Sequence, residues 1–450
     1  MSPTSLRERV ETQAVAPRYG VFLGLGGVLT LVGLLLFILT ATGPQADRAW
    51  HLFHVNWLFF TGLAGGSVAF AAVQKVTKGH WSGLIIRFAE ACSAFLPVSF
   101  LGFLVIFSVG YPHIYPAMEG LPHGKALWLS HGWMFWRIFL SLGLLYWLGF
   151  RLIRADLVPD LYGLQGLVTG RRARLWTSLL RGFDGSAEAV ARNDETIYRL
   201  APAYVVTYAM VLTVVAFDGI MALQPHWYSN LLGGFFFMGS FLGAHMLLAL
   251  LMLVGGRELG IGGLISPKQR HDLGKLCFGF TVFWAYLMFA QFLVIWYGNL
   301  PEETGFVFTR LWGPWLPIGR AVFLGMFLIP FFGLLGVMPK KLPLTLGLFT
   351  SISLVSLWLE RYLLVVPSIT AESGPRFGLP ELGPTLLFTG LFLLSYGVFS
   401  RLFPMISPRL AEITLNRERG HVHYALEFEH EEGARDYVSP EAMERRRRSR

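Results

Sequence analysis

Seven side chains with a formal charge lie within long apolar stretches of the chain, where they could do chemistry: Arg87, Glu90, Arg137, Asp218, Arg320, Glu360 and Arg361. A charge at the centre of a bilayer costs about 3 kcal/mol on insertion scales, so it is usually paired or functional. Buried carboxyl groups beside Arg or His can exchange protons near neutral pH. The set therefore predicts a proton path or a quinone-headgroup site. The alternative is a set of ion pairs that only fix the helices.

Two carboxyl groups are the leading candidates. Asp218 is the first, because it lies beside Gly219 in an otherwise apolar helix near the expected outer face. Glu90 is its counterpart near the inner face, three residues after Arg87 and thus on the same helix face. Arg87 could instead extend along the helix to the inner surface. For Glu360 and Arg361 a packing ion pair is the favoured alternative.

Histidine and cysteine are poorly placed for metal cofactors. Only His131 and His245 lie deep enough to be haem ligands or proton carriers, and no repeated His pair marks two haems. Cys92 and Cys277 cannot supply a four-cysteine cluster, and no C-x-x-C-H motif is present for covalent haem. We therefore expect no metal, no covalently bound cofactor and no haem. Five other histidines at the expected outer boundary are interpreted as surface or capping residues: His51, His54, His113, His123 and His226.

The composition indicates what must position these residues. Of 450 residues, 54% are hydrophobic and only 14% are charged, against roughly 25% in soluble proteins. Mean hydropathy is +0.53. These values exclude a soluble enzyme, a disordered chain and a secreted disulfide scaffold. The formal net charge of +9 then reports membrane topology rather than a nucleic-acid partner.

Ten apolar stretches reach the roughly 20 residues that a helix needs to cross a bilayer. They predict an all-α polytopic membrane protein with a membrane domain at 20–400, an N-terminal tail at 1–19 and a C-terminal tail at 401–450. The expected spans are 20–42, 52–73, 83–107, 127–150, 200–222, 231–255, 276–298, 314–338, 343–365 and 384–400.

Lys and Arg set the orientation. With a cytoplasmic N-terminus, the inner segments carry 29 of them and the outer segments four, which predicts that both termini are cytoplasmic. The inner loop at 151–199 contains alternating apolar and basic residues at 171–181, typical of an amphipathic helix on the membrane surface. A docking face for a neighbouring subunit is the alternative. The C-terminal tail, with Arg445 to Arg448, is expected to be partly disordered.

Helices two to five are echoed by helices six to nine. The pattern predicts two parallel four-helix bundles, at 52–222 and 231–365, flanked by helices 20–42 and 384–400. In this repeat Arg320 corresponds to Arg137, and Glu360 corresponds to Asp218. Small residues at helix spacing, Gly62 with Gly66 and Gly239 with Gly243, are expected at helix contacts.

Several segments together resemble one family. The sequence FDGIMALQPHWYS at 217–229 resembles a segment typical of the membrane subunits of alternative complex III, in the NrfD/PsrC-like family. Further similar segments are HDLGKL at 271–276, FWAY at 283–286, IWYGNLPEET at 295–304, 59–66, RFAEA at 87–91 and WLERYLL at 358–364. The chain is similar to the shorter of the two large membrane subunits of that complex.

This resemblance implies ten helices in two bundles with two flanking helices. It also implies a non-redox subunit of a quinol:electron-acceptor oxidoreductase in the bacterial cytoplasmic membrane. Quinol or menaquinol is then oxidised near the outer face, and electrons pass to an iron–sulfur subunit and c-type cytochromes. The better-supported quinol site of the family belongs to the sister subunit, ActC. The chain departs from the family where Gly219 replaces a Trp and Gln224 an acid, which puts one outer proton-relay position in doubt.

Glu302 and Glu303 fall in an expected outer loop, where they could dock the iron–sulfur or haem subunits or be ordinary solvated charges. The leading interpretation is an integral subunit of a respiratory quinol oxidoreductase that contributes a proton path, a quinol site or both. Two alternatives stay open. One is a secondary transporter or proton channel that acts alone, and the other is a structural anchor for electron-transfer subunits.

Overall fold

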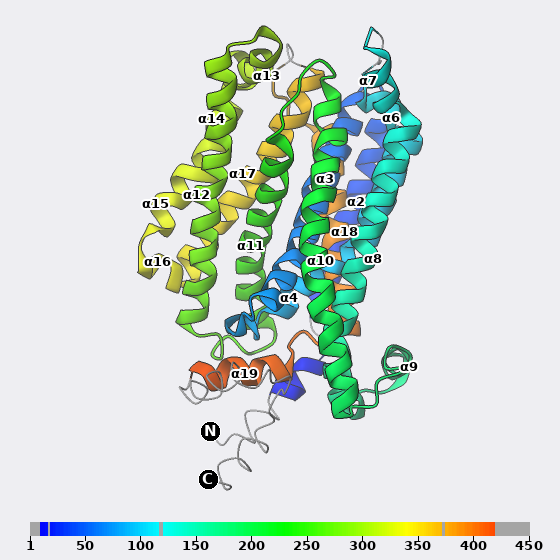
Figure 1. The fold of residues 1–450 in the computed structure, drawn as a ribbon, viewed down its shortest axis with the longest axis vertical. Helices are drawn as coiled ribbons and strands as arrows, with labels where there is room; N and C mark the ends of the chain where they lie inside the picture. The colour runs from blue at the N-terminus through cyan, green and yellow to red at the C-terminus, as the bar shows by residue number, and fades with distance from the viewer. Residues whose placement is uncertain (1–9, 17–18, 117–119, 371–373, 419–450) are drawn as a thin grey trace.

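The computed structural model describes residues 10–16, 19–116, 120–370 and 374–418. Within these residues the regular structure is helical, and ten helical segments are long and apolar enough to cross a membrane (Figure 1). The predicted class, an all-α polytopic membrane protein, is confirmed. The predictions for most of the N-terminal tail and for Arg445 to Arg448 concern residues outside those described.

The spans follow in chain order, and two of them, spans three and eight, consist of several consecutive helical segments. Spans one and two are α2 (Gly20–Ala41) and α3 (Ala46–Val76). Span three comprises α4 (Ile86–Ala91), η2 (Cys92–Phe95), α5 (Leu96–Val105), a π-helical turn η3 (Ile106–Gly110) and α6 (Tyr111–Ile114). Spans four and five are α8 (His131–Leu164), continued by η4 (Gln165–Leu167), and α10 (Ala187–Gly219), continued by η5 (Met221–Leu223).

Spans six to ten make up the second half of the membrane domain. Spans six and seven are α11 (Leu232–Glu258) and α12 (Pro267–Gly298). Span eight comprises η6 (Gly313–Trp315), α14 (Leu316–Phe323), a π-helical turn η7 (Leu324–Leu328) and α15 (Ile329–Leu335), and spans nine and ten are α17 (Pro343–Ile369) and α18 (Leu379–Leu402). Short helices join or cap the spans: α7 (His123–Trp128), α9 (Gly170–Leu179), α13 (Pro301–Leu311), α16 (Val337–Lys341) and α19 (Pro408–Glu418).

Several helices extend well beyond the apolar stretches that identify them. Helix α8 continues to Leu164 rather than ending near 150, and α10 begins at Ala187 rather than near 200. The Ser186 hydroxyl accepts a hydrogen bond from the Ala189 amide and so caps α10. Hydropathy detects only the part of a helix inside the hydrocarbon, and these charged ends lie beyond it. The segment 151–199 is therefore largely helical.

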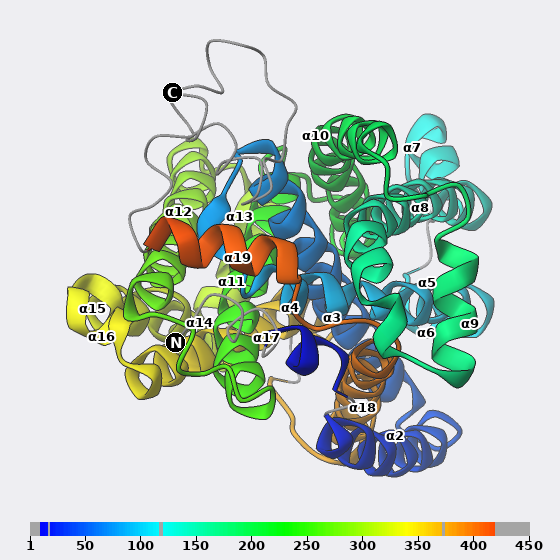
Figure 2. The same ribbon diagram turned by 90° about the horizontal axis from the view of Figure 1, so that it is seen from below.

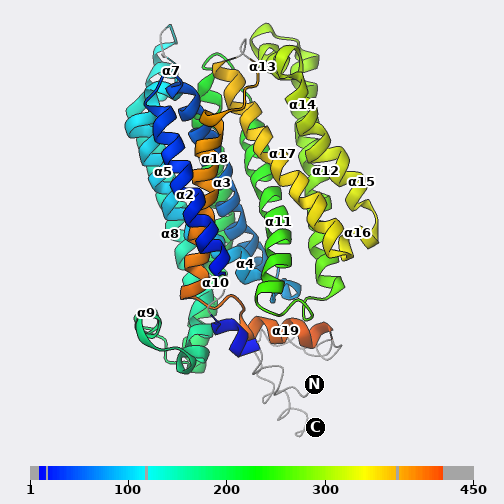
Figure 3. The same cartoon turned by 180° about the vertical axis from the view of Figure 1, so that it is seen from behind.

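Helices α2 and α18 pack side by side at the edge of the molecule (Figures 2 and 3). A Cβ atom on Gly33 would lie 2.2 Å from the Leu387 nitrogen, and one on Gly390 would lie 2.4 Å from the Thr30 nitrogen. The two backbones therefore touch through glycine. Such small-residue contacts are the usual means of bringing helices together where lipid removes the hydrophobic driving force.

Helices α3 and α11 form the centre, where the two predicted bundles meet. Gly62 and Gly66 face α11, and a Cβ atom on Gly62 would lie 2.4 Å from the Ser240 hydroxyl. Gly243 in turn faces Leu63 on α3 and Leu357 on α17. The prediction that these small residues lie at helix contacts is confirmed. Helix α3 is consequently buried along nearly its whole length, which places its polar side chains inside the protein.

The helices outside the spans lie at opposite ends of the molecule. Helices α9 and α19 lie at one end, and α7 and α13 lie at the other (Figure 1). The predicted amphipathic helix is present as α9, and its face is partly docked on the chain itself. The Trp176 indole donates to the Leu402 carbonyl at 2.8 Å, and Arg172 donates to the Val15 carbonyl at 2.6 Å. That the α9 end faces the cytoplasm stays a prediction from charge, and we call it the inner end.

Candidate functional site

The outer part of the first bundle holds a buried ion pair between two predicted residues. Arg137 on α8 donates from Nε to Asp218 Oδ2 at 2.8 Å and from Nη2 to Oδ1 at 2.6 Å. The Asp218 side chain is 1% exposed, and that of Arg137 is 15% exposed. Arg137 also lies over the Trp128 ring, 4.0 Å from its centroid, and contacts the Trp128 carbonyl. The guanidinium is thus fixed on one side by an acid and on the other by an indole.

A buried histidine lies next to this pair. His54 Nε2 lies 2.7 Å from the Gly219 carbonyl oxygen, so Nε2 carries the proton and donates. The other ring nitrogen, Nδ1, is buried and has no hydrogen-bond partner among the described residues. A Cβ atom on Gly219 would lie 3.5 Å from His54 Nε2 and 3.2 Å from Leu58. Gly219 therefore lies in close contact with the histidine.

Aromatic side chains extend the outer site towards His131. The ring of His54 packs edge-on against Tyr115, and Tyr115 stacks on Tyr111 with centroids 4.6 Å apart. Tyr111 contacts His131, whose Nε2 lies 2.9 Å from the Phe107 carbonyl. Burial, together with the negative charge of Asp218, raises the pKa of Tyr115 and keeps its phenol neutral. We call Arg137, Asp218, His54, Tyr111 and Tyr115 the outer site.

The prediction that His51 and His54 are surface or capping residues is wrong. Their exposed fractions are 2% and 0%. His51 Nε2 lies 2.8 Å from the His113 carbonyl, and His113 itself pairs with Asp47. The error arose from the start of helix α3, which begins at Ala46 rather than near 52. The three-residue spacing of the two histidines on one helix face was the signal available in the sequence.

The inner end of the first bundle holds a larger charged network centred on Arg87. Its Nη1 donates to Glu90 Oε2 at 2.5 Å, as the three-residue spacing predicts, and its Nη2 donates to Asp160 Oδ2 at 2.6 Å. Asp156 Oδ2 lies 3.3 Å from the same Nη2. The Arg87 side chain is 0% exposed, so the alternative that it extends to the surface is wrong. Three segments far apart in sequence meet here, because Ser407, just before α19, also donates to Asp160 at 2.9 Å.

Two further basic side chains close this network. Lys75 at the end of α3 pairs with Asp156. Arg409 on α19 lies 3.4 Å from Asp156 and 3.8 Å from Asp194 on α10. The inner network thus contains three basic and four acidic side chains: Lys75, Arg87, Arg409, Glu90, Asp156, Asp160 and Asp194. Asp156, Asp160 and Asp194 were not predicted as site residues, since they fall in the segment expected to be a loop.

The second bundle pairs its charges differently. Arg361 Nη1 donates to Glu360 Oε2 at 2.6 Å, and Nη2 donates to the Ser240 hydroxyl at 3.1 Å. Glu360 Oε1 is buried without a hydrogen-bond partner among the described residues. Arg320, which the repeat makes equivalent to Arg137, lies exposed on α14 and forms no ion pair among those residues. In the first bundle an arginine on one helix pairs with an acid on another, whereas in the second bundle the pair joins two adjacent residues of α17.

His245 forms no ion pair with any of the charged groups described above. Its Nδ1 lies 2.7 Å from the Phe241 carbonyl one turn earlier on α11, and its ring packs among Phe70, Phe241 and Phe280. Its exposed fraction is 1%. In the described part of the chain no group of three His, Cys, Asp or Glu side chains could hold a metal ion. That the chain binds no haem stays a prediction.

Glu302 and Glu303 lie in the first turn of α13, at the outer end. Glu302 is exposed, and Glu303 is half-buried beside Tyr228. A hydrogen bond to the Glu303 carboxylate raises the pKa of Tyr228. Arg310 links α13 to α17, because its guanidinium donates to the Leu363 and Leu364 carbonyls at 2.9 and 2.8 Å. The two acids thus belong to a rigid helix that caps α17.

Comparison with protein-family models and with curated proteins finds no match to this chain.

Proposed function

We propose that this chain is an integral, non-redox subunit of a respiratory quinol:electron-acceptor oxidoreductase of the alternative complex III type. Within that family it would be the counterpart of the shorter large membrane subunit, ActF. Support comes from the ten-helix architecture and from the family-like segments at 217–229 and 271–304. The arrangement of ionisable groups adds a third, independent argument.

The observation that carries the proposal is the outer site. Oxidation of a quinol releases two protons, and a site that assists it needs a proton acceptor beside the headgroup. Asp218 is a carboxylate held in one orientation by two hydrogen bonds from Arg137. His54, on the other side of Gly219, is buried with one ring nitrogen unpaired among the described residues. Asp218 thus lies one residue from the carbonyl that His54 contacts, and the His54 ring packs against Tyr115. Carboxyl and imidazole groups are the usual proton acceptors in proteins.

The outer site would receive protons from quinol and release them to the outer aqueous phase. Arg137 supports this role in two ways. Its charge stabilises the carboxylate form of Asp218, and its 15% exposed side chain reaches towards the surface. In this scheme Asp218 is the acceptor, His54 donates to the neighbouring Gly219 carbonyl, and the buried Tyr115 hydroxyl has no hydrogen-bond partner among the described residues. No cofactor is carried by the chain itself.

The outer helix α13 is the proposed docking place for the electron-transfer subunits. Glu302 and Glu303 stand on a helix fixed by Arg310, so a basic partner would meet acids in a defined position. The expected partners are the sister subunit ActC, an iron–sulfur subunit and c-type cytochromes. The expected location is the bacterial cytoplasmic membrane.

Purification of the tagged chain in a mild detergent tests the proposal. The absorption spectrum of the purified material should show c-type haem, and its chemical analysis should show iron and acid-labile sulfide in fixed proportion to the chain. A chain that purifies alone from the same membranes, as a folded protein without haem or iron, would contradict the proposal. That result would favour a transporter or channel that acts alone.

A further inference from the structure

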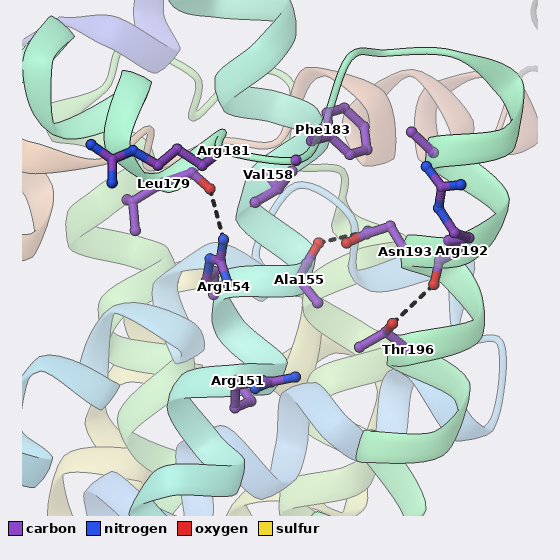
Figure 4. A pocket seen from close by; sticks show the side chains of 12 residues that line it. Arg151, Arg154, Ala155, Val158, Leu179, Arg181, Phe183, Arg192, Asn193 and Thr196 are labelled. Atoms are coloured by element: carbon purple, nitrogen blue, oxygen red, sulfur yellow. Dashed lines mark hydrogen bonds between the residues drawn. The ribbon is translucent and has the colours of Figure 1, made fainter.

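The inner end of the first bundle contains a pocket lined by four arginines. It lies between α8, α10 and the connection from α9 to α10, and its volume is about 190 Å³ (Figure 4). Arg151 and Arg154 come from α8, Arg181 from the connection and Arg192 from α10. No acidic side chain lines the pocket, so its formal charge is +4.

The four arginines differ in whether another group of the protein already binds their guanidinium. Arg192 pairs with Glu188 at 2.7 Å, and Arg154 donates to the Leu179 carbonyl at 3.0 Å. Arg151 and Arg181 have no acidic partner in the part of the chain that the structure describes. Arg151 is 5.6 Å from the centroid of the Trp147 ring. Two of the four arginines thus line the pocket without a counter-charge from the described residues.

The walls of the pocket are held in place by the protein itself. The hydrogen bond from Arg154 fixes the end of α9 over α8, and Asn193 on α10 donates to the Ala155 carbonyl on α8 at 2.8 Å. Both bonds are visible in Figure 4. Phe183 closes the pocket and packs against Tyr162. The elements that carry the four arginines are therefore held together by the fold.

The position of the pocket indicates where its ligand comes from. Arg151 lies 20 residues after His131 on α8, or about 30 Å along the helix, which equals the thickness of the hydrocarbon core. Towards the membrane the same helix face continues through Trp147 and Leu144, which are 54% and 50% exposed. On α10 the face of Arg192 and Thr196 continues through exposed Val206 and Met210. Apolar side chains therefore lead directly from the arginines into the bilayer.

We propose that this pocket binds the phosphate of an anionic phospholipid whose acyl chains lie along the exposed faces of α8 and α10. Guanidinium groups bind phosphate oxygens through paired, charge-assisted hydrogen bonds. Basic pockets between helices at the inner interface are typical binding places for anionic lipid headgroups. A free phosphate ion shares the headgroup chemistry but gains nothing from the apolar faces. The proposal is independent of the outer site.

The test uses the intact protein, extracted in mild detergent, stripped of lipid and titrated with one lipid at a time under native mass spectrometry. The site variant is Arg151→Gln with Arg181→Gln. The matched control is Arg171→Gln with Arg174→Gln, which removes two exposed arginines of α9 that do not line the pocket. We expect the affinity for the first phosphatidylglycerol to fall about tenfold or more in the site variant and to stay unchanged in the control. Phosphatidylcholine should bind more weakly to all three proteins.

An equal loss in both double variants would overturn the proposal, because diffuse surface charge would then explain the binding. Equal affinity for phosphatidylcholine would do the same. Inorganic phosphate that displaces the lipid at the same concentration would assign the pocket to a free anion instead. A photoactivatable phosphatidylglycerol on the unmodified protein gives an answer that needs no variant. Its label should fall on the peptide containing Phe183 and Asn193, and a label confined to other helices would contradict the site.

Discussion

The two charged regions of the first bundle differ in how completely the protein encloses them. At the inner end, Arg87 is fully buried and contacts three acids, two of which have further partners on other segments. At the outer end, one arginine meets one acid, and the arginine remains 15% exposed. A charge held from every side cannot change protonation or partner without disrupting the fold. The comparison therefore favours a structural role for the inner network and, under the proposed function, a chemical role for the outer site.

The largest expected loss of stability is for a substitution in the inner network, Arg87→Ala. Arg87→Ala removes the cation that contacts Glu90, Asp156 and Asp160, and leaves the buried Glu90 and Asp160 carboxylates without an ion-pair partner among the described residues. Breaking a buried ion pair from one side costs about 3–5 kcal/mol. We expect little folded protein in the membrane and a clearly lowered unfolding temperature in detergent. A variant that accumulates and unfolds like the unmodified protein would show that the network does not stabilise the fold.

An intermediate effect is expected for His54→Phe. The substitution keeps an aromatic ring but removes the donor to the Gly219 carbonyl, a buried acceptor. An unsatisfied buried acceptor costs about 1–3 kcal/mol. The variant should therefore fold and insert, with a smaller decrease in unfolding temperature than Arg87→Ala. If His54→Phe lowered the unfolding temperature more than Arg87→Ala does, the outer site would contribute more to stability than the inner network, contrary to the comparison.

The smallest effect is expected for Arg320→Gln. Its side chain is exposed and has no ion-pair partner among the described residues. Substitutions at such positions usually change stability by less than about 0.5 kcal/mol. Arg137→Gln, at the equivalent position of the first bundle, should in contrast leave Asp218 buried and unpaired. Equal losses of stability and quinol-driven turnover in the two variants would mean that both halves of the repeat carry the same kind of site.

Much of the architecture could be predicted because the bilayer imposes it. A long apolar stretch has few options other than a helix, so all ten spans were found from composition. The contact between Arg87 and Glu90 followed from helix spacing alone. The ends of helices were less predictable, since α8 and α10 continue through charged residues that hydropathy treats as loop. Asp156 and Asp160 were missed for that reason.

The pairing of charges could not be predicted, because it depends on which helices touch. Asp218 and Arg137 were both candidates, but their contact requires α8 and α10 to lie side by side, which no local pattern specifies. Glu360 is the opposite case, because its ion pair with the adjacent Arg361 could be expected from the sequence alone. The repeat matched Arg320 to Arg137, yet Arg320 forms no ion pair among the described residues. Similar sequence order in the two halves therefore did not produce similar contacts.

The most direct test compares two carboxylates that are bound in the same way. Glu381 accepts both Nε and Nη2 of Arg48 at 2.7–3.0 Å and is buried like Asp218, but it lies between α3 and α18, away from the outer site. Asp218→Asn and Glu381→Gln each replace a paired carboxylate with an amide of the same shape. Quinol-driven reduction of the electron acceptor should be measured in complexes purified with equal haem content. We predict a loss of about a hundredfold for Asp218→Asn and little change for Glu381→Gln. Unchanged turnover for Asp218→Asn, or an equal loss in both variants, would contradict the assignment of the chemistry to the outer site.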